Sequence, residues 1–172
     1  MSARLPVRFD PYQLVSNEAS LNGKLAIKQF ERLSELLETA GGSVDVALKF
    51  HQIKNWRNCV SGHCEAKVKL ICQRCLGECE YSISSQIRLG FVEKESSIKQ
   101  LPSDIEPFML TDEKVIYLID LLEDELLLQI PLAPMHTDRD NCNPEMTKYE
   151  VSGEEEPETP KQKNPFAVLK EL

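Results

Sequence analysis

Alternation of apolar and polar residues predicts three extended segments in the first half of the chain. Residues 43–51 place an apolar side chain at every second position, and residues 57–71 continue the same pattern. A third, weaker run covers about residues 80–92. A period of two is typical of a strand with one buried face. The three runs are therefore predicted to form an antiparallel meander.

Apolar residues at three- and four-residue steps predict helices on either side of these strands. Residues 26–39 have this pattern, and so do the residues from Val115 to Leu126, which predict a helix of about fourteen residues ending before Pro131. Asp10 and Pro11 are typical of a helix start, with an N-cap carboxylate and proline at the first helical position.

Glycine, asparagine and proline residues predict where the strands and helices are interrupted. Asn22-Gly23 and Lys54-Asn55 are typical of turns, and Gly62 is a position at which a strand bulges or bends. Residues 106–110 predict an edge strand that begins beside Pro107.

The resulting fold class is α+β: a small antiparallel β-sheet meander with helices packed on one face and a disordered acidic C-terminal tail. Residues 1–136 are predicted to form the folded domain. Residues 137–163 have no periodicity and are rich in Glu and Pro, so they are interpreted as an acidic disordered linker. Residues 164–172 are predicted to form a short helical segment.

Charge and composition indicate where the protein is located and in which state its cysteines are. The net charge is −8, but residues 1–100 carry 14 Lys and Arg against 11 Asp and Glu, whereas residues 101–172 carry 6 against 17. The chain has no long apolar run and no apolar core of a signal peptide near Met1, so we expect a cytoplasmic protein that does not enter a membrane. Its six cysteines are then reduced thiols or metal ligands.

Cys72 and Cys75 form a Cys-x-x-Cys pair at the predicted turn between two strands. Two thiolates at this spacing can bind one tetrahedral Zn²⁺, and His136 and Cys142 are candidates for the other two ligands. Zinc is therefore the one cofactor that the sequence suggests. Alternatively, Cys72 and Cys75 are small turn residues without metal.

A redox dithiol is a further interpretation, because Arg74 would lower the pKa of a neighbouring thiol. Catalytic Cys-x-x-Cys pairs, however, open a helix in a βαβ unit, whereas this pair lies between predicted antiparallel strands. Cys59, Cys64 and Cys79 have no ligand spacing and are interpreted as small buried apolar residues. The sequence contains no phosphate-binding loop or hydrolase motif, so neither an enzyme nor a small-molecule substrate is expected.

Six basic residues gather on the predicted sheet and are candidates for RNA binding. They are Lys54, Arg57, Lys67, Lys69, Arg74 and Arg88. Trp56 and Tyr81 are near enough in sequence to offer rings for base stacking. An ordinary solvated sheet face is the alternative interpretation, since RNA-binding domains are usually more basic.

Phe166 and Leu169 interrupt the polar C-terminal region with apolar side chains. An apolar segment that follows an acidic tether gains stability only by docking, either on its own domain or on a partner. Both residues are therefore candidates for partner docking.

Several motifs together resemble one bacterial family. They are Cys72-Gln73-Arg74-Cys75-Leu76, the segment from Glu123 to His136, the segment from Lys163 to Leu169, and the opening from Leu5 to Pro11. They are similar to the YceD family, named for large ribosomal RNA subunit accumulation, and the resemblance covers nearly the whole chain. Many members carry a second cysteine cluster where this chain has His136 and Cys142.

The resemblance implies a non-enzymatic role in the synthesis, processing or stability of 23S rRNA. The expected partners are 23S rRNA or large-subunit assembly intermediates, bound directly or through a protein. The alternative is a protein-only adaptor that binds a ribosomal protein or a nuclease through its acidic tail. A zinc or dithiol protein is the third interpretation.

Overall fold

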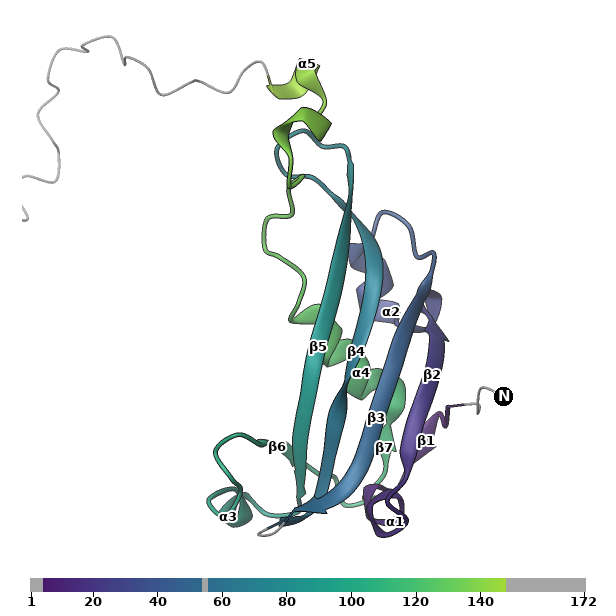
Figure 1. The fold of residues 1–172 in the computed structure, drawn as a ribbon, viewed down its shortest axis with the longest axis vertical. Coiled ribbons are helices and arrows are strands. Elements are labelled where there is room, and N and C mark those ends of the chain that lie inside the picture. The colour runs from purple at the N-terminus through teal and green to yellow at the C-terminus, as the bar shows by residue number, and fades with distance from the viewer. Residues whose placement is uncertain (1–4, 54–55, 148–172) are drawn as a thin grey trace, which may run out of the picture.

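A computed structural model describes residues 5–53 and 56–147, without the side chains of residues 56 and 57. It contains a long sheet backed by short helices (Figure 1). The strands are β1 (Arg8–Phe9), β2 (Ser20–Ala26), β3 (Ser43–Ile53), β4 (Trp56–Ile71), β5 (Glu78–Val92), β6 (Glu106–Met109) and β7 (Ile116–Tyr117). The helices are α1 (Pro11–Ser16), η1 (Ile27–Gln29), α2 (Glu31–Leu36), α3 (Glu95–Ile98), α4 (Leu118–Leu127), η2 (Arg139–Asn141) and α5 (Pro144–Thr147).

The main sheet has the strand order β2-β3-β4-β5-β6. Strands β2 to β5 form an antiparallel meander, and β6 adds to β5 in parallel. Strands β1 and β7 pair separately and antiparallel. The hairpin of β4 and β5 extends well beyond the other strands (Figure 1). The predicted α+β class with an antiparallel meander is thus confirmed, and the sheet is larger than three strands.

Helices α2 and α4 lie behind the sheet in Figure 1 and cover one of its faces. The alternating apolar residues of β3, β4 and β5 point into this layer and are buried. Phe50 packs edge-on against Phe9, with ring centroids 5.3 Å apart, and stacks on Phe91 at 6.4 Å. The opposite face of the sheet is largely exposed, so the pattern of period two separates a core face from an open face.

A buried carboxylate joins α2 to α4. Glu123 is 4% exposed, and its Oε1 accepts a hydrogen bond of 3.0 Å from the backbone N–H of Leu33 in the first turn of α2. Its Oε2 lies 2.9 Å from Nε of Arg32. The first N–H groups of a helix have no partner within that helix, and Phe30 at the N-cap offers none from its side chain. Glu123 supplies this capping acceptor from another helix.

The predicted helix over residues 26–39 is only partly correct. The structure has the turn η1 and the six-residue α2, separated by Phe30 in an extended conformation with φ −96° and ψ 94°. Ile27, Phe30 and Leu33 are all fully buried, so the apolar pattern identified the core face. The extended residue ends one turn and caps the next while keeping its ring in the core.

Two predictions at glycine residues differ from the structure. Asn22-Gly23 is not a turn but lies inside β2, paired with Ala47 and Val46 of β3, because strand pairing outweighs the local turn preference. Gly62 keeps regular register with both neighbouring strands and is therefore not a bulge. A Cβ at Gly62 would lie 2.0 Å from the Ala47 carbonyl oxygen, so the glycine permits a close approach of two backbones.

The helix predicted from Val115 starts later than expected. Residues 116–117 pair with β1 as β7, and α4 begins at Leu118. The prediction of an edge strand at residues 106–110 is confirmed by β6, and Asp10 caps α1 as predicted through its carboxylate and the N–H of Tyr12. Lys54-Asn55 lies outside the described residues.

Candidate metal centre

The tip of the β4–β5 hairpin is a tight turn that directs two thiols inward. The N–H of Cys72 donates to the Gly77 carbonyl at 2.9 Å, and the N–H of Leu76 donates to the Cys72 carbonyl at 2.8 Å. Leu76 is in the left-handed region, with φ +58°, which reverses the chain directly after Cys75. Cys72 and Cys75 are consequently 0% and 3% exposed although they lie at the end of the molecule.

The segment after α4 returns to this tip along β5 (Figure 1). The Pro134 carbonyl accepts a hydrogen bond of 2.7 Å from the N–H of Gln73. The Tyr81 hydroxyl donates to the Met135 carbonyl at 2.5 Å and accepts from the Met135 N–H at 2.8 Å. These bonds hold the backbone of Pro134 and Met135 against the hairpin tip. His136 is the next residue, so its imidazole lies close to the two cysteines.

Four potential metal ligands meet at the tip. The ligand atoms of Cys72, Cys75, His136 and Cys142 all lie within 4.8 Å of one another. Nδ1 of His136 is 3.5 Å from the Cys75 sulfur and 3.4 Å from the Cys142 sulfur. Zn–S bonds of about 2.3 Å and Zn–N bonds of about 2.0 Å at tetrahedral angles imply S···N separations of about 3.5 Å. The four side chains therefore have the composition and spacing of a closed Cys₃His zinc site.

The orientation of the His136 ring also fits a ligand. Its Nε2 lies 2.9 Å from the Glu78 carbonyl oxygen, to which it can only donate a hydrogen. In the neutral ring the proton then resides on Nε2, and Nδ1 presents a lone pair to the three sulfurs. Metal-binding histidines are characteristically fixed by such a second hydrogen bond.

Backbone hydrogen bonds favour thiolates at the Cys-x-x-Cys pair. Burial raises the pKa of Cys72, but hydrogen bonds from the backbone of His136, Cys75 and Arg74 outweigh it and lower the value to about 6. Hydrogen bonds from the backbone of Asn143 and Gly77 likewise lower the pKa of Cys75, against the effect of burial. Thiolate is the form that binds a metal.

The other buried cysteines behave differently. Burial raises the pKa of Cys59 and of Cys64 to about 11, and it also raises that of Cys79, whose sulfur donates to the Leu70 carbonyl. All three are buried outside the four-residue cluster, which agrees with their predicted role as small core residues. The cluster also lies between antiparallel strands and not at a helix N-terminus, which does not match the arrangement of a dithiol oxidoreductase.

Arg74 is directed at the cluster. Its Nε donates to the Cys142 sulfur at 3.1 Å, and one terminal nitrogen donates to the His136 carbonyl at 3.3 Å. Burial raises the pKa of Cys142, and Arg74 opposes this effect. With three thiolates around a divalent ion, the arginine would also offset the excess negative charge.

We expect Arg74→Gln to weaken zinc binding by about tenfold or more, because partners of metal ligands typically contribute this much. A competition titration with a zinc chelator measures the change. Lys67→Gln, which removes one positive charge from an exposed strand position, is the matched control and should leave the affinity unchanged. Equal affinities of the Arg74→Gln protein and the unmodified protein would show that Arg74 does not support the site.

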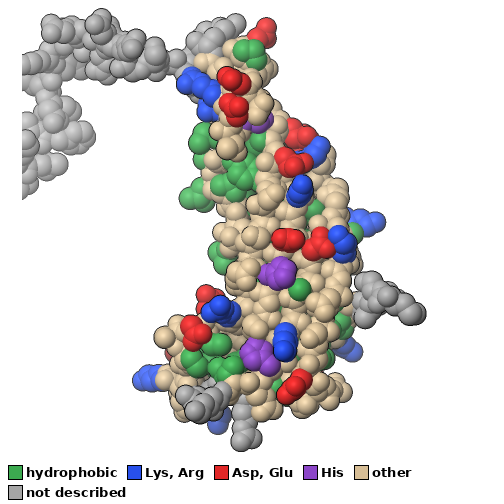
Figure 2. Space-filling model, viewed as in Figure 1, with side chains coloured by type: hydrophobic (Ala, Val, Ile, Leu, Met, Phe, Trp, Pro, Cys, Tyr) green, Lys and Arg blue, Asp and Glu red, His purple; other side chains and the backbone are tan. Residues whose placement is uncertain are grey.

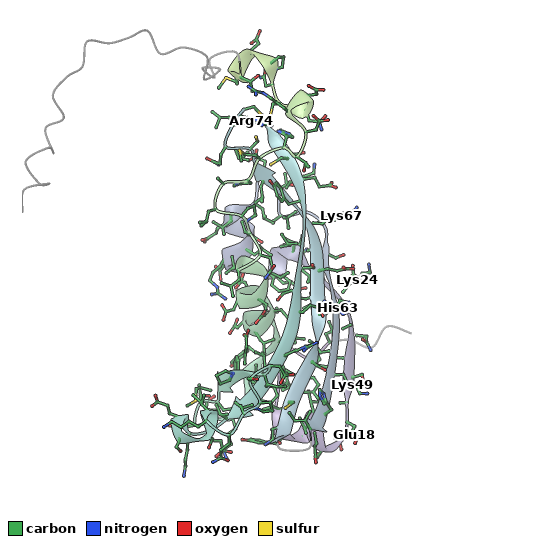
Figure 3. All side chains as sticks on the ribbon, turned by 60° about the vertical axis from the view of Figure 1, so that its left-hand side comes forward. Glu18, Lys24, Lys49, His63, Lys67 and Arg74 are labelled. Atoms are coloured by element: carbon green, nitrogen blue, oxygen red, sulfur yellow. The ribbon has the colours of Figure 1, made fainter. Side chains whose placement is uncertain are left out.

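The remaining RNA-binding candidates are distributed over the open face. Lys67 and Lys69 point outward from β4, and Arg88 points outward from β5. Figure 3 shows Lys24, Lys49, His63 and Lys67 on this same side, away from the helices. Lys24 and Lys49 were not among the residues predicted from the sequence, although alternation along residues 43–51 places Lys49 on the polar side of its strand. Lys54 and the side chain of Arg57 lie outside the described residues.

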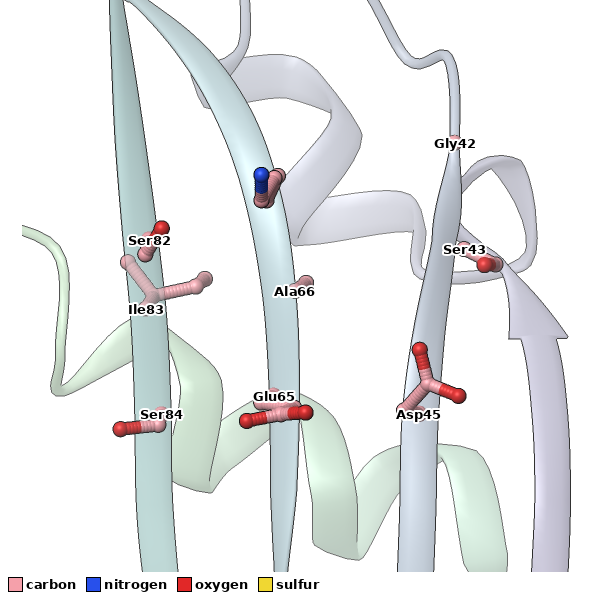
Figure 4. Close-up of a pocket in the computed structure, with 9 residues that line it drawn as sticks. Gly42, Ser43, Asp45, Glu65, Ala66, Ser82, Ile83 and Ser84 are labelled. Atoms are coloured by element: carbon pink, nitrogen blue, oxygen red, sulfur yellow. The ribbon is translucent and has the colours of Figure 1, made fainter.

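The open face carries both signs of charge, as Figure 2 shows. Lys24 pairs with Asp45 at 2.8 Å and Lys69 with Glu78 at 2.7 Å. A hollow of about 400 Å³ lies across β3, β4 and β5 (Figure 4). Its polar lining comprises Ser43, Asp45, Glu65, Lys67, Ser82 and Ser84. Within the described ranges, no outward-facing side chain of β2 to β5 is Phe, Tyr or Trp; His63 offers an imidazole ring, and Tyr81 instead bonds to Met135.

Phe166 and Leu169 lie outside the described residues, so their docking stays a prediction. The division of the chain into residues 1–136, 137–163 and 164–172 also stays a prediction. The structure describes η2 and α5 at the start of residues 137–163. None of the helices in the described residues is long and apolar enough to span a bilayer.

Comparisons with known proteins agree on one family. A model of the family described as "Large ribosomal RNA subunit accumulation protein YceD" matches residues 60–172. The chain is also 30% identical over 169 residues to the "Large ribosomal RNA subunit accumulation protein YceD" of Haemophilus influenzae. The aligned region covers 98% of this chain and 96% of that protein. No solved structure matches the chain.

Proposed function

Since the chain belongs to the YceD family, we propose that it supports the accumulation of large-subunit ribosomal RNA, and that it does so by binding and not by catalysis. The similarity over nearly the whole length of the chain carries this proposal. Its direct test is depletion of the protein in its own host. The amount of 23S rRNA should fall relative to 16S rRNA, and an unchanged ratio would reject the role. Such a role places the protein in the cytoplasm.

The hairpin tip is proposed to hold one structural Zn²⁺. The donor set of three thiols and one imidazole suits zinc, and four protein ligands leave no open position for a substrate. When bound, the ion supplies four bonds that join the β4–β5 tip to the segment containing His136 and Cys142. This site supports a binding function because it shapes a surface instead of exposing a reactive metal.

The open face of the sheet is the proposed contact for RNA. Lys67 and Lys49 are exposed on neighbouring strands, and no ion pair of either is found among the described residues. His63 lies between them along β4. A face of this kind, without an exposed Phe, Tyr or Trp among the described side chains, suits phosphate contacts and the shape of a folded RNA more than stacking on single-stranded bases. Arg88 and Lys69 extend the same face.

We expect Lys49→Glu with Lys67→Glu to weaken association with 23S rRNA and to leave the melting temperature unchanged, because both side chains are exposed. The slope of log K against log salt concentration should become shallower by about one unit for every phosphate that a lysine no longer neutralises. Filter binding at several salt concentrations measures this slope. Lys28→Glu, an exposed lysine in η1 on the other side of the sheet, is the control. Binding that survives the double substitution would remove the open face from the RNA interface.

A protein-only adaptor is the second candidate function, and the pairing of charges on the open face favours it. Lys24 and Lys69 are each neutralised by an acidic neighbour, which reduces the attraction for phosphate. Ultraviolet crosslinking followed by sequencing of bound RNA separates the two candidates. Crosslinks to 23S rRNA support direct contact, whereas recovery of ribosomal proteins without crosslinked RNA supports the adaptor.

A further inference from the structure

Exposed apolar side chains are frequent at the hairpin tip that carries the cysteine cluster and along the segment that runs from α4 to that tip (Figure 1). Nine large apolar residues are exposed within the described ranges, and five of them belong to the hairpin tip or to the chain from Leu128 to the end of α5. Figure 2 shows hydrophobic side chains gathered over this region. Leu76 is 61% exposed, Leu132 is fully exposed and Met135 is 44% exposed. We call these three residues the apolar rim.

The apolar rim is tied to the cluster through the backbone. Leu76 directly follows Cys75, and Met135 directly precedes His136, while the Cys75 sulfur and the His136 ring are 3.5 Å apart. Two chain segments distant in sequence are thus held together at positions next to these exposed apolar residues. Leu132 lies three residues before Met135, and Pro134 between them is fixed to Gln73 by a hydrogen bond.

Leu76 has an unusual combination of conformation and exposure. Its φ of +58° is a conformation that glycine or asparagine adopts much more readily than leucine. The side chain is nevertheless large, apolar and exposed. Backbone strain of this kind at an exposed tip is an observation from which a contact can be inferred. Nothing among the described residues covers the outer surface of this leucine.

Residues 164–172 of the same chain are apolar enough, and follow the cluster closely enough, to reach the apolar rim. Twenty-five residues follow Thr147, and Thr147 is only five residues after Cys142 of the cluster. Phe166 lies 19 residues beyond Thr147, and a flexible tether of this length spans about 24 Å on average. Phe166, Leu169 and Leu172 recur at three-residue steps, which places them on one face if the segment is helical.

We propose that residues 164–172 dock on the apolar rim of their own chain. The tether holds the segment at an effective concentration of about millimolar near the rim, so even weak apolar contacts populate the docked state. This inference does not depend on the role in rRNA accumulation. It adds an interaction surface and names its occupant, because the segment starts from the end of the molecule at which the rim lies.

Nuclear magnetic resonance of the full-length, zinc-loaded protein tests the proposal. Phe166→Ala with Leu169→Ala should shift the backbone resonances of residues 74–77 and 132–136 and leave those of α1 unchanged. Amide exchange in residues 166–172 should be slowed several-fold in the unmodified chain, and the double substitution should abolish the slowing. Unchanged resonances at the apolar rim would overturn the proposal.

Substitutions in the apolar rim provide the reciprocal test. Leu76→Ser with Leu132→Ser should free residues 166–172 to the same extent, and since both side chains are exposed the fold should be retained. Leu36→Ser, which alters a leucine on α2 that is 56% exposed, is the matched control. Rapid exchange of residues 166–172 in the unmodified chain would show that the segment is not docked on its own domain. Shifts that disappear on dilution would assign the rim to a second copy. Either result rejects docking within the chain.

Discussion

Removal of zinc is expected to lower the melting temperature of the protein by about 8–16 °C. A ligand present at about 1,000 times its Kd stabilises the folded state by about 4 kcal/mol, and in a domain of this size each kcal/mol corresponds to about 2–4 °C. The purified protein should contain close to one equivalent of zinc. Differential scanning calorimetry with and without a chelator measures the shift. If the purified protein contained no zinc and its melting temperature did not change on addition of the chelator, the metal site would be rejected.

Two substitutions test whether the loss of stability arises at the proposed ligands. Cys72→Ser and His136→Ala should each release zinc and reproduce most of the shift. His63→Ala removes an imidazole from the exposed face of β4 and should have no effect on zinc content. Hydrogen exchange should localise the change to residues 137–147, because Cys142 is their buried anchor at the tip. If residues 137–147 exchanged at the same rate in the zinc-loaded and the zinc-free protein, the metal would not be what holds this segment at the tip.

Glu123→Ala is expected to reduce the free energy of unfolding by about 1–3 kcal/mol. The N–H of Leu33 at the start of α2 would be left without its carboxylate acceptor, whereas Arg32, which is 53% exposed, would stay solvated and paired with Asp124. The corresponding fall in melting temperature is about 2–12 °C. Urea unfolding followed by circular dichroism measures the change.

The neighbouring Asp124 provides a matched control. It pairs with the same arginine, Arg32, at 2.8 Å, but its side chain is 64% exposed. Asp124→Ala should therefore change the free energy of unfolding by about 0.5 kcal/mol or less. Glu123→Gln retains an acceptor for Leu33 and should fall between the two. Equal losses for both alanine variants would place the stabilisation in the exposed ion pair and not in the buried helix cap.

The parts of the fold predicted correctly are those in which burial follows a simple period. Residues 43–51 and 57–71 alternate because one face of the sheet packs on helices and the other meets water. The N-cap at Asp10 is a local interaction and could likewise be predicted. In both cases the residues that determine the structure are close in sequence.

The predictions that failed depended on distant partners. Nothing near Asn22-Gly23 indicates that β3 will pair with it, and local turn preference gave the opposite answer. Phe30 interrupts a helical pattern because its ring must reach the core, which the three- and four-residue spacing does not reveal. The pairing of β7 with β1 joins residues more than a hundred positions apart.

The candidate site was predicted in part. The Cys-x-x-Cys pair has a recognisable spacing, whereas His136 and Cys142 became candidates only by their residue types and by the resemblance to a family. The structure brings all four side chains together, and binding of the metal stays a prediction. The contacts of Arg74 with Cys142 and His136 were not predicted, because a position between two cysteines fits an RNA contact equally well. Its hydrogen bonds to Cys142 and His136 distinguish the two roles.

The separation of the cluster in sequence has a consequence during synthesis. Cys75 precedes His136 by 61 residues, so at translation rates of about 5–20 residues per second the first two thiols are made about 3–12 s before the other ligands. The β4–β5 hairpin can form in microseconds, long before that interval ends. Once Val92 has been made the hairpin is complete, and each nascent chain then carries two of the four candidate ligands at its tip until His136 and Cys142 follow. An ion bound there would reach full coordination only after Cys142 has been made.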